Sequence, residues 1–341
     1  MCLEKFGWNS FFEGEFSRFA APGVEPARVA LADRELFVVW TRSAERKAAV
    51  TGRLRHSGEL WPAVGDWVAL ENGCRIAGIL PRQSAFSRKQ AGAATRPQVI
   101  AANIAVLFII NGLDGDLNPR RLERYMLLAW ESGARPVVVL NKADVCADVP
   151  SAAESVATLA SGAPVIAVSA LEGWGLPAID GQLRPGETAA LVGSSGAGKS
   201  TLLNRLLGRE QQRVQPVRGG DSRGRHTTVR RELFLCANGR LLIDTPGFRE
   251  LQLWANPESV NTAFDDIAAL ASSCRFRNCR HQGEPGCAVV ASEVDEARLA
   301  SYAKLQRELA HLDRKLDQLA AQKEKQRIKR IHLAMRARNR D

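Results

Sequence analysis

A glycine-rich segment, GSSGAGKS at 193–200, has the residue types and spacing of a phosphate-binding loop. It follows an apolar stretch and precedes a helical pattern, so backbone N–H groups and the positive end of a helix can surround phosphate oxygens. We expect Lys199 to reach the β- and γ-phosphates and Ser200 to ligate Mg²⁺. The predicted nucleotide-binding residues here are Gly193, Ser194, Ser195, Gly196, Ala197, Gly198, Lys199, Ser200 and Thr201.

A second apolar stretch ends in the sequence DTPG at 244–247. A carboxylate at the end of a buried strand is placed to bind Mg²⁺, directly or through water, so Asp244 is a candidate for this role. Gly247 can offer its N–H group to a γ-phosphate. DTPG alone also fits an ordinary turn after a strand. Its position downstream of a phosphate loop favours the functional interpretation.

The sequence NKAD at 141–144 predicts recognition of a guanine base. The Asp144 carboxylate can accept hydrogen bonds from the ring N1–H and the exocyclic amine of guanine, and adenine offers neither donor in that geometry. Asn141 is expected to support the loop, and the Lys142 stem to cover the ring. One strand–helix unit later, Ser169 and Ala170 supply a backbone N–H group for the guanine carbonyl oxygen.

The segment between the phosphate loop and DTPG has the composition of a mobile loop, GGDSRGRHTTV at 219–229. Together with this segment, the motifs resemble the motif set of GTPases, in which a threonine from such a region closes on Mg²⁺. Thr227 and Thr228 are the candidates, and Thr228 is preferred. Phe248 follows DTPG where a water-orienting glutamine is usual. His226 is therefore a hypothesis for positioning the attacking water, and a simple solvent-exposed histidine is the alternative.

Three of the seven cysteines lie close together beside a histidine. Three thiolates and one imidazole suit a closed tetrahedral Zn²⁺ site, and the short polar segments between them could not form a core without a clamp. With all four positions filled by protein, a structural ion is expected rather than a catalytic one. The predicted zinc ligands are Cys274, Cys279, His281 and Cys287.

The 341 residues show three successive patterns, which predict a multidomain chain. Short β segments separated by turn residues predict a small N-terminal barrel, OB-like being one option, at about 27–90 within a first domain, 1–95. The basic, small-residue-rich stretch at 87–97 is expected to be a linker. After it, strands alternating with helices predict a mostly parallel α/β domain at 96–254, and the nearly unbroken apolar run at 99–112 is expected to be its first buried strand. A mostly helical domain follows at 255–341. Its apolar stripe is expected to pack on its own domain rather than form a coiled-coil dimer, so a monomer is predicted; the stripe comprises Tyr302, Leu305, Leu309, Leu312, Leu316 and Leu319.

Composition and charge exclude some classes of protein. Hydrophobic residues make up 45% and charged residues 25%, which excludes global disorder. No run of 18 apolar residues occurs and the N-terminus lacks an apolar signal core, so we expect a soluble cytoplasmic protein without a membrane partner. The net charge is +10, and residues 323–341 supply +6 of it. Such a basic tail suits phosphate backbones, although a solvated terminus is the alternative.

The motifs occur in a rotated order, with guanine recognition first, then the phosphate loop, then DTPG. That order is typical of circularly permuted GTPases. Together with GRHTT at 224–228, DTPGF at 244–248 and the cysteine spacing, it resembles the RsgA (YjeQ) family over nearly the whole chain. The resemblance implies an N-terminal OB fold, which AVGDWV at 63–68 matches, a central permuted P-loop GTPase domain and a C-terminal zinc domain. It also implies binding to the maturing small ribosomal subunit and its rRNA, with slow GTP hydrolysis that the subunit stimulates.

The residues themselves agree with this expectation. A missing glutamine predicts slow intrinsic hydrolysis, and the barrel, the basic tail and the arginines Arg275, Arg277 and Arg280 predict RNA contact. Release after hydrolysis would use the loop 209–228 as the moving part. Two alternatives remain open: a permuted GTPase with another ribosomal or RNA client, and an RNA-binding module with weak nucleotide turnover.

Overall fold

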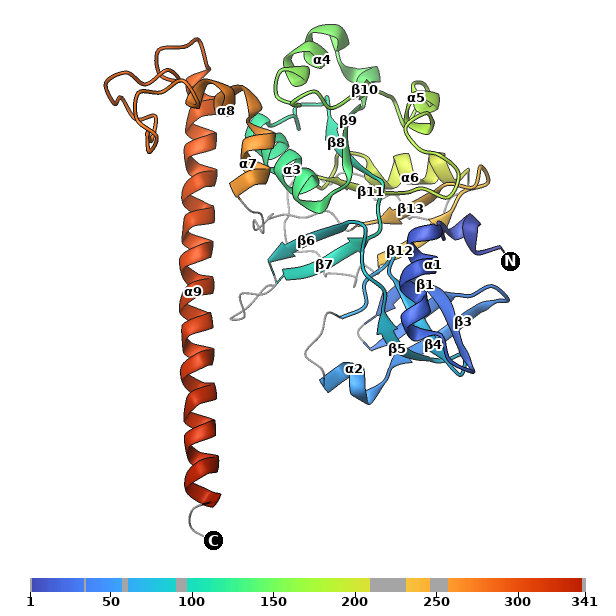
Figure 1. Cartoon of the computed structure of the whole chain (residues 1–341). Helices are drawn as coiled ribbons and strands as arrows, with labels where there is room; N and C mark the ends of the chain where they lie inside the picture. Colours follow the sequence, from blue (N-terminus) through green and yellow to red (C-terminus); the bar gives the residue numbers. More distant parts are fainter. Residues whose placement is uncertain are drawn as a thin grey trace, which may run out of the picture. The chain divides into compact units, whose positions relative to one another are not determined.

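The computed structural model describes residues 2–33, 35–56, 61–89, 97–208, 231–245 and 257–338 (Figure 1). The chain forms two compact units, one of Met1–Arg88 with Val99–Leu251 and one of Lys89–Gln98 with Gln252–Asp341. The threefold division predicted at 1–95, 96–254 and 255–341 stays a prediction. Among the described residues, no helix has the length and apolar character needed to cross a bilayer.

Five N-terminal strands close into a barrel: β1 (Val24–Asp33), β2 (Leu36–Trp40), β3 (Glu45–Val50), β4 (Trp67–Glu71) and β5 (Arg75–Ile79). Their order is β1-β2-β3-β5-β4, and β4 pairs back onto β1. Apolar side chains that alternate along these strands fill the interior, among them Val29, Phe37, Val39, Val68 and Ile76. The OB-like barrel predicted from the turn pattern is confirmed.

The central sheet contains β8 (Val106–Gly112), β9 (Arg135–Asn141), β10 (Val165–Ala167), β11 (Thr188–Gly193), β12 (Arg231–Leu235) and β13 (Leu241–Asp244). The strand order is β10-β9-β8-β11-β13-β12, and every pair is parallel except β12 with β13. All residues of β8, β11 and β13 are buried, which explains their nearly unbroken apolar sequences. The mostly parallel sheet predicted from the strand–helix alternation is confirmed.

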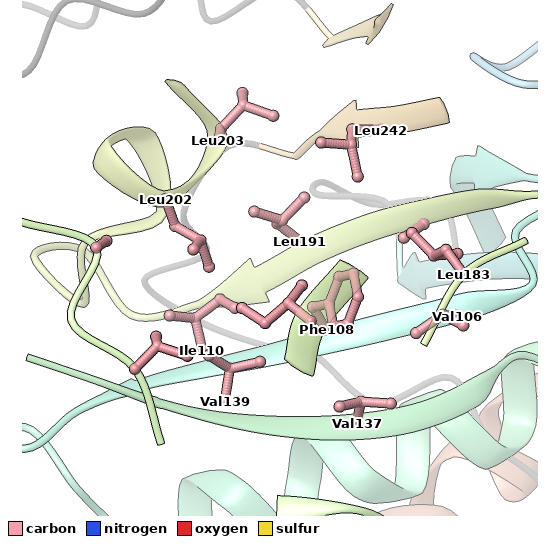
Figure 2. Close-up of a cluster of buried hydrophobic side chains, with 14 of the residues drawn as sticks. Val106, Phe108, Ile110, Val137, Val139, Leu183, Leu191, Leu202, Leu203 and Leu242 are labelled. Carbon is pink, nitrogen blue, oxygen red and sulfur yellow. The ribbon is translucent and has the colours of Figure 1, made fainter. Parts of the chain in front are cut away.

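The helices that follow these strands are α3 (Pro119–Ser132), α4 (Val149–Ala157), α5 (Leu176–Asp180) and α6 (Lys199–Leu207). Figure 2 shows Leu202 of α6 pointing toward the face of the sheet that carries Phe108, Ile110, Val139 and Leu191. This buried cluster fixes α6 against β8, β9 and β11. The loops at the carboxyl ends of these strands therefore start from a rigid base, which is where ligands bind in open α/β sheets.

The apolar run at 99–112 was expected to be one strand, and this expectation is wrong. It divides into β7 (Pro97–Ala102) and β8, with Asn103 between them at a φ of +54°. The Asn103 amide accepts a hydrogen bond from the Gln83 N–H (2.9 Å) and donates to the Gly65 carbonyl (3.0 Å), so its side chain stabilises the break. β7 pairs with β6 (Ala85–Lys89) in a separate two-stranded sheet. Residues 90–96 of the predicted linker lie outside the described residues.

The barrel and the central sheet are hydrogen-bonded to each other, which the sequence did not indicate. β1 pairs antiparallel with β12 through Leu31 with Glu232 and Ala32 with Arg231, so eleven strands form one continuous sheet. The N-terminal segment covers the barrel through α1 (Ser10–Phe16). There Trp8 packs edge-on against Trp67, with 4.7 Å between ring centroids. No role had been assigned to this segment, and its aromatic residues belong to a buried cluster.

Arg28 of β1 joins these parts from a fully buried position (1% exposed). Its guanidinium donates to the carbonyls of Phe6, Gly65 (3.3 Å) and Asn103 (3.3 Å) and to the hydroxyl of Thr188 at the start of β11 (2.7 Å). Burial lowers the pKa of Arg28 to about 9, and Asp66 opposes this shift. One side chain thus satisfies acceptors of the N-terminal segment, the barrel and the central sheet.

We expect Arg28→Met to lower the free energy of unfolding by about 3 kcal/mol, because several buried acceptors would lose their donor. Urea unfolding measures this change. Arg18→Met is a matched control, since the Arg18 side chain is 71% exposed and pairs with nearby Glu15; its cost should stay below about 1 kcal/mol. Equal unfolding midpoints for the two variants would contradict the role of Arg28.

The second unit contains α7 (Pro257–Ala263), α8 (Asp265–Ala271) and the long α9 (Glu296–Arg338). Arg298 at the start of α9 forms two 2.7 Å hydrogen bonds to the Asp266 carboxylate and stacks on Phe264. Tyr302, Leu305, Leu309 and Leu312 of the predicted stripe are buried. The side chains of Leu316, Leu319 and most of the basic tail lie outside the described ones. The expected mostly helical domain is therefore present.

Candidate functional site

The phosphate loop connects β11 to α6, as its sequence requires. Gly193 has a φ of +151°, and a Cβ atom there would lie 2.3 Å from the Ile110 carbonyl oxygen. Gly198 has a φ of +88°, and a Cβ atom there would lie 2.2 Å from the Asn141 amide nitrogen. Neither position tolerates a side chain, since the loop is pressed against β8 and the NKAD segment. The glycines thus let the backbone close into a cradle at the start of α6.

Lys199 opens α6 and is nearly buried (8% exposed). Its ammonium donates to the carbonyl oxygens of Gly193 (3.0 Å) and Ser194 (2.5 Å), so it lies inside the loop. Burial lowers the pKa of Lys199 to about 8, and Asp244 and Asp116 oppose this shift. The cation is therefore held at the position where phosphate oxygens would meet the loop.

Asp244 ends β13 beside the phosphate loop and lies in parallel register with Leu191 of β11. Burial raises the pKa of its carboxyl group, and Lys199 opposes this shift. The next residue, Thr245, donates its hydroxyl to the Leu191 carbonyl and so fixes the exit of the strand. Ser200 is half-buried in the first turn of α6. Asp244 and Lys199 thus interact electrostatically at one edge of the sheet, and Ser200 follows Lys199 along the chain. The other residues predicted to act here lie outside the described residues: His226, Thr227, Thr228 and Gly247.

Asn141 connects the guanine and phosphate segments. Its side chain is buried (2% exposed), donates from Nδ2 to the Ala197 carbonyl (2.9 Å) and accepts at Oδ1 from the Ala170 N–H (3.0 Å). One amide therefore links NKAD, the phosphate loop and the 169–171 segment. The structure brings together three sequence motifs that lie up to 56 positions apart.

We expect Asn141→Asp to weaken GDP binding about 10-fold or more, because the donor to the Ala197 carbonyl becomes a carboxylate oxygen that repels it. The free energy of unfolding should fall by about 1–3 kcal/mol. Fluorescence titration with GDP and urea unfolding give both values. Asn9→Asp is the matched control: Asn9 caps α1 with its side-chain oxygen, which aspartate retains. Wild-type GDP affinity in Asn141→Asp would contradict the connecting role.

The remaining guanine-site residues lie around Asn141. Lys142 has a φ of +63°, and its ammonium pairs with Asp114 at 2.5 Å. Asp144 is exposed two residues later. Ser169 is fully buried, and its hydroxyl accepts from the Glu172 N–H (3.0 Å), which shapes the turn that presents Ala170. This arrangement leaves the Asp144 carboxylate accessible to a base.

Arg205 belongs to this site, although it had not been singled out from the sequence. From α6 it donates to the carbonyl oxygens of Ala170 (3.0 Å) and Leu171. The helix that starts at the phosphate loop is thereby fastened to the loop that would contact guanine. Its place in the helix, six residues after Lys199, gave no local signal, because the contact joins segments 35 residues apart.

The four residues of the predicted zinc site converge in the second unit, and their ligand atoms lie within 4.8 Å of one another. The Cys274 sulfur is 4.0 Å from the Cys287 sulfur and 3.7 Å from the His281 Nδ1, and Nδ1 is 3.4 Å from the Cys287 sulfur. Tetrahedral zinc, with Zn–S near ~2.3 Å and Zn–N near ~2.0 Å, requires edges of about 3.8 and 3.5 Å. The donor set and its spacing fit a metal ion of this size.

Backbone hydrogen bonds shape the loop that carries these ligands. The Glu284 carboxylate accepts from the N–H groups of Gln282 (2.7 Å) and Arg280 (2.9 Å), and these bonds lower the pKa of Glu284 to about 2. The Val290 N–H donates to the Cys287 sulfur (3.4 Å), as backbone groups commonly do around metal thiolates. The loop is thus folded around the cluster by its own polar groups.

Comparison with protein families gives two matches. A family described as RsgA GTPase matches residues 79–254, which is more than half of the chain. A family described as 50S ribosome-binding GTPase matches residues 188–331.

Relatives extend the likeness over the full length. A protein of Opitutus terrae named small ribosomal subunit biogenesis GTPase RsgA is 46% identical and covers 100% of this chain and 98% of its own. One of Lactiplantibacillus plantarum, named small ribosomal subunit biogenesis GTPase RsgA 2, is 45% identical over 96% of this chain and 97% of its own. Among solved structures, YjeQ from Thermotoga maritima has the same fold, with a TM-score of 0.63 and 23% identity over 84% of this chain and 99% of its own.

Proposed function

Because the chain belongs to the RsgA family of circularly permuted GTPases, we propose that it is a GTP-hydrolysing switch for the maturing small ribosomal subunit. It binds the subunit and its rRNA with GTP bound, the subunit stimulates hydrolysis, and the protein leaves afterwards. The observation that carries the proposal is the 46% identity to a small-subunit biogenesis GTPase along the entire chain, barrel and metal cluster included. The protein binds the subunit and hydrolyses GTP in the cytoplasm, as a monomer.

In this proposal the nucleotide is held by the two connected loops. Asp144 reads the guanine edge, Lys142 covers the base and the Ala170 N–H group meets the guanine carbonyl oxygen. Loop 193–198 surrounds the phosphates, and Lys199 contacts the β- and γ-oxygens. The Asn141 and Arg205 contacts support this assignment, because they fix the segments that would bind the base relative to the segments that would bind the phosphates.

The GTPase uses Mg²⁺ with GTP, and we assign its ligands to Ser200 and Thr228, with Asp244 nearby. The electrostatic interaction between Asp244 and Lys199 supports this placement of the metal, since a divalent ion there would meet a carboxylate at the end of β13, close to the loop. Gly247 would offer its N–H group to the γ-phosphate. His226 remains the hypothesis for orienting the attacking water.

We assign zinc to the four-residue cluster in the second unit. The Cys₃His donor set can fill all four tetrahedral positions, the ligand atoms of Cys274, His281 and Cys287 are separated by 3.4–4.0 Å, and all four ligand atoms lie within 4.8 Å of one another, which supports a structural ion. The ion would supply folding free energy to a loop whose other residues are mainly polar. It therefore serves RNA contact indirectly, by fixing the loop that carries the arginines.

The metal loop presents side chains suited to single-stranded RNA. Arg275, Arg277 and Arg280 are exposed, and Phe276 is 44% exposed with the Arg275 guanidinium 5.5 Å from its ring centre. Guanidinium groups neutralise phosphates, and an exposed aromatic face stacks on an unpaired base. This surface supports rRNA as the partner of the second unit.

We expect Phe276→Ala to weaken binding to a single-stranded RNA oligonucleotide by about 5- to 100-fold, the range for loss of one base–aromatic stack. Filter binding at fixed salt measures it. Val290→Ala is the matched control, because Val290 is an apolar side chain of the same loop region with similar exposure (49%). If both variants bound RNA as the wild type does, the stacking role would be wrong.

Co-sedimentation with ribosomal subunits tests the proposed client. With a non-hydrolysable GTP analogue, the protein should pellet with small subunits and not with large ones, and with GDP it should stay in the supernatant. A GTPase of the large subunit is the second candidate, because residues 188–331 match the family described as 50S ribosome-binding GTPase. Preferential pelleting with large subunits would favour that candidate.

A further inference from the structure

The loop between β8 and α3, residues 113–118, lies at the same edge of the sheet as the phosphate loop, because β8 and β11 are neighbouring parallel strands. Its sequence, LDGDLN, matched none of the nucleotide motifs. Two carboxylates in it face the nucleotide segments. Asp114 pairs with Lys142 of NKAD, and Asp116 contacts the phosphate loop itself.

Asp116 is held from several sides. Its Oδ2 accepts a hydrogen bond from the hydroxyl of Ser194, the first residue of the phosphate loop after Gly193. Its Oδ1 lies 2.8 Å from the Arg121 guanidinium, which also donates to the Asp116 backbone carbonyl. The carboxylate and the guanidinium are 22% and 30% exposed. The hydroxyl therefore bonds to a partly buried, oriented carboxylate, a strong type of hydrogen bond.

Ser194 is thus held through both its side chain and its backbone. Its hydroxyl is bound by Asp116, and its carbonyl accepts from the Lys199 ammonium at 2.5 Å. Lys199 begins α6, so the loop is held at its helical end by the lysine and at its strand end by the aspartate. A shift of Ser194 would turn the following N–H groups, those that face phosphate oxygens.

We propose that Asp116 is a positioning residue of the phosphate loop, which it holds in the phosphate-binding conformation through its hydrogen bond with Ser194. Arg121 supports this role, since it orients the carboxylate and neutralises its charge close to where anionic phosphates bind. The proposal rests on the GTPase activity of the chain and not on the identity of its client. It assigns a function to a segment outside the motif set.

The expected effect is on binding and not on chemistry. The loop contacts phosphates in the ground state and in the transition state alike, so loosening it removes uniform binding. We expect Asp116→Asn to raise the KM for GTP and the Kd for GDP about 10-fold each, with kcat within about twofold of the wild type. Ser194→Ala, which removes only the hydroxyl, should reproduce this pattern.

A double-mutant cycle without ribosomal particles tests the proposal, with KM, kcat and Kd for GDP measured for each variant. The Kd of the double variant for GDP should be about the same as that of either single variant, because each single change already removes the same hydrogen bond. Asp180→Asn is the charge-matched control; Asp180 pairs with Arg240 at 2.9 Å, outside the nucleotide segments, and it should keep wild-type values.

Three results would overturn the positioning role: an unchanged KM and Kd in Asp116→Asn, losses in the two single variants that multiply in the double variant, or a fall in kcat with an unchanged KM. A wild-type chain that failed to bind GDP would instead overturn the nucleotide assignment itself. The two failures are therefore distinguishable in the same experiment.

Discussion

Asp144→Asn is expected to lower the affinity for GTP by about three orders of magnitude and to raise the affinity for xanthosine triphosphate. In our assignment the Asp144 carboxylate accepts two hydrogen bonds from the guanine edge. An asparagine amide would place a donor against one guanine donor, so one hydrogen bond is lost and another polar group is left unpaired. Sites built on such hydrogen bonds discriminate by about 10⁴–10⁵ between matched and unmatched ligands. Xanthine carries a carbonyl where guanine carries its amine, and it would accept from the new amide.

Competition binding with GTP, inosine triphosphate and xanthosine triphosphate measures this switch. Asp148→Asn is the matched control, since Asp148 caps α4 through its side-chain oxygen and asparagine caps equally well. Inosine triphosphate, which lacks the exocyclic amine, should lose less affinity than GTP on mutation of Asp144. Equal affinity of wild type and Asp144→Asn for GTP would show that another residue reads the base.

Removal of the metal should strongly affect the folding of the metal loop and its binding to RNA. The structural zinc sites of small domains contribute about 10–16 kcal/mol of apparent binding free energy. The loop at 274–287 has few apolar residues, so hydrophobic burial could not replace this stabilisation. We expect Cys287→Ser, or treatment with a strong chelator, to unfold this loop and abolish binding to RNA. Basal GTP hydrolysis should stay within about twofold, because every assigned nucleotide residue lies in the other unit.

Hydrogen exchange of the loop, zinc content by atomic absorption and GTP turnover together test this prediction. Cys74→Ser is the matched control, since Cys74 is an exposed cysteine outside the cluster. It should retain one zinc per chain and full RNA binding. A Cys287→Ser protein with a protected loop and normal RNA affinity would refute a structural role for the ion.

Much of the site was predictable because its residues fall at the ends of strands. The phosphate loop, NKAD and the 169–171 segment each follow an apolar strand, and parallel strands bring their carboxyl ends to one edge. The barrel was predictable because its strands are short, alternate in polarity and are separated by turn residues. In both cases the decisive information is local.

What the sequence did not reveal depends on contacts between distant segments. The pairing of β1 with β12 joins residues about 200 positions apart, and the sequence of neither strand indicates which strand it pairs with. Arg28 looks like a surface arginine in its strand, yet it is buried because four other segments of the chain supply acceptors for its guanidinium. Asn103 breaks an apolar run that satisfied every rule for one strand, since its side chain finds partners only in the folded chain.

The proposed client can be tested by measuring GTP turnover of the purified protein, alone and with small or large ribosomal subunits. We expect slow hydrolysis by the protein alone, strong stimulation by small subunits and little or none by large ones. Stimulation by small subunits should also require the intact metal loop and its arginines. Equal stimulation by both subunits, stimulation by large subunits alone, or none by either would contradict the proposed client while leaving the permuted GTPase fold in place.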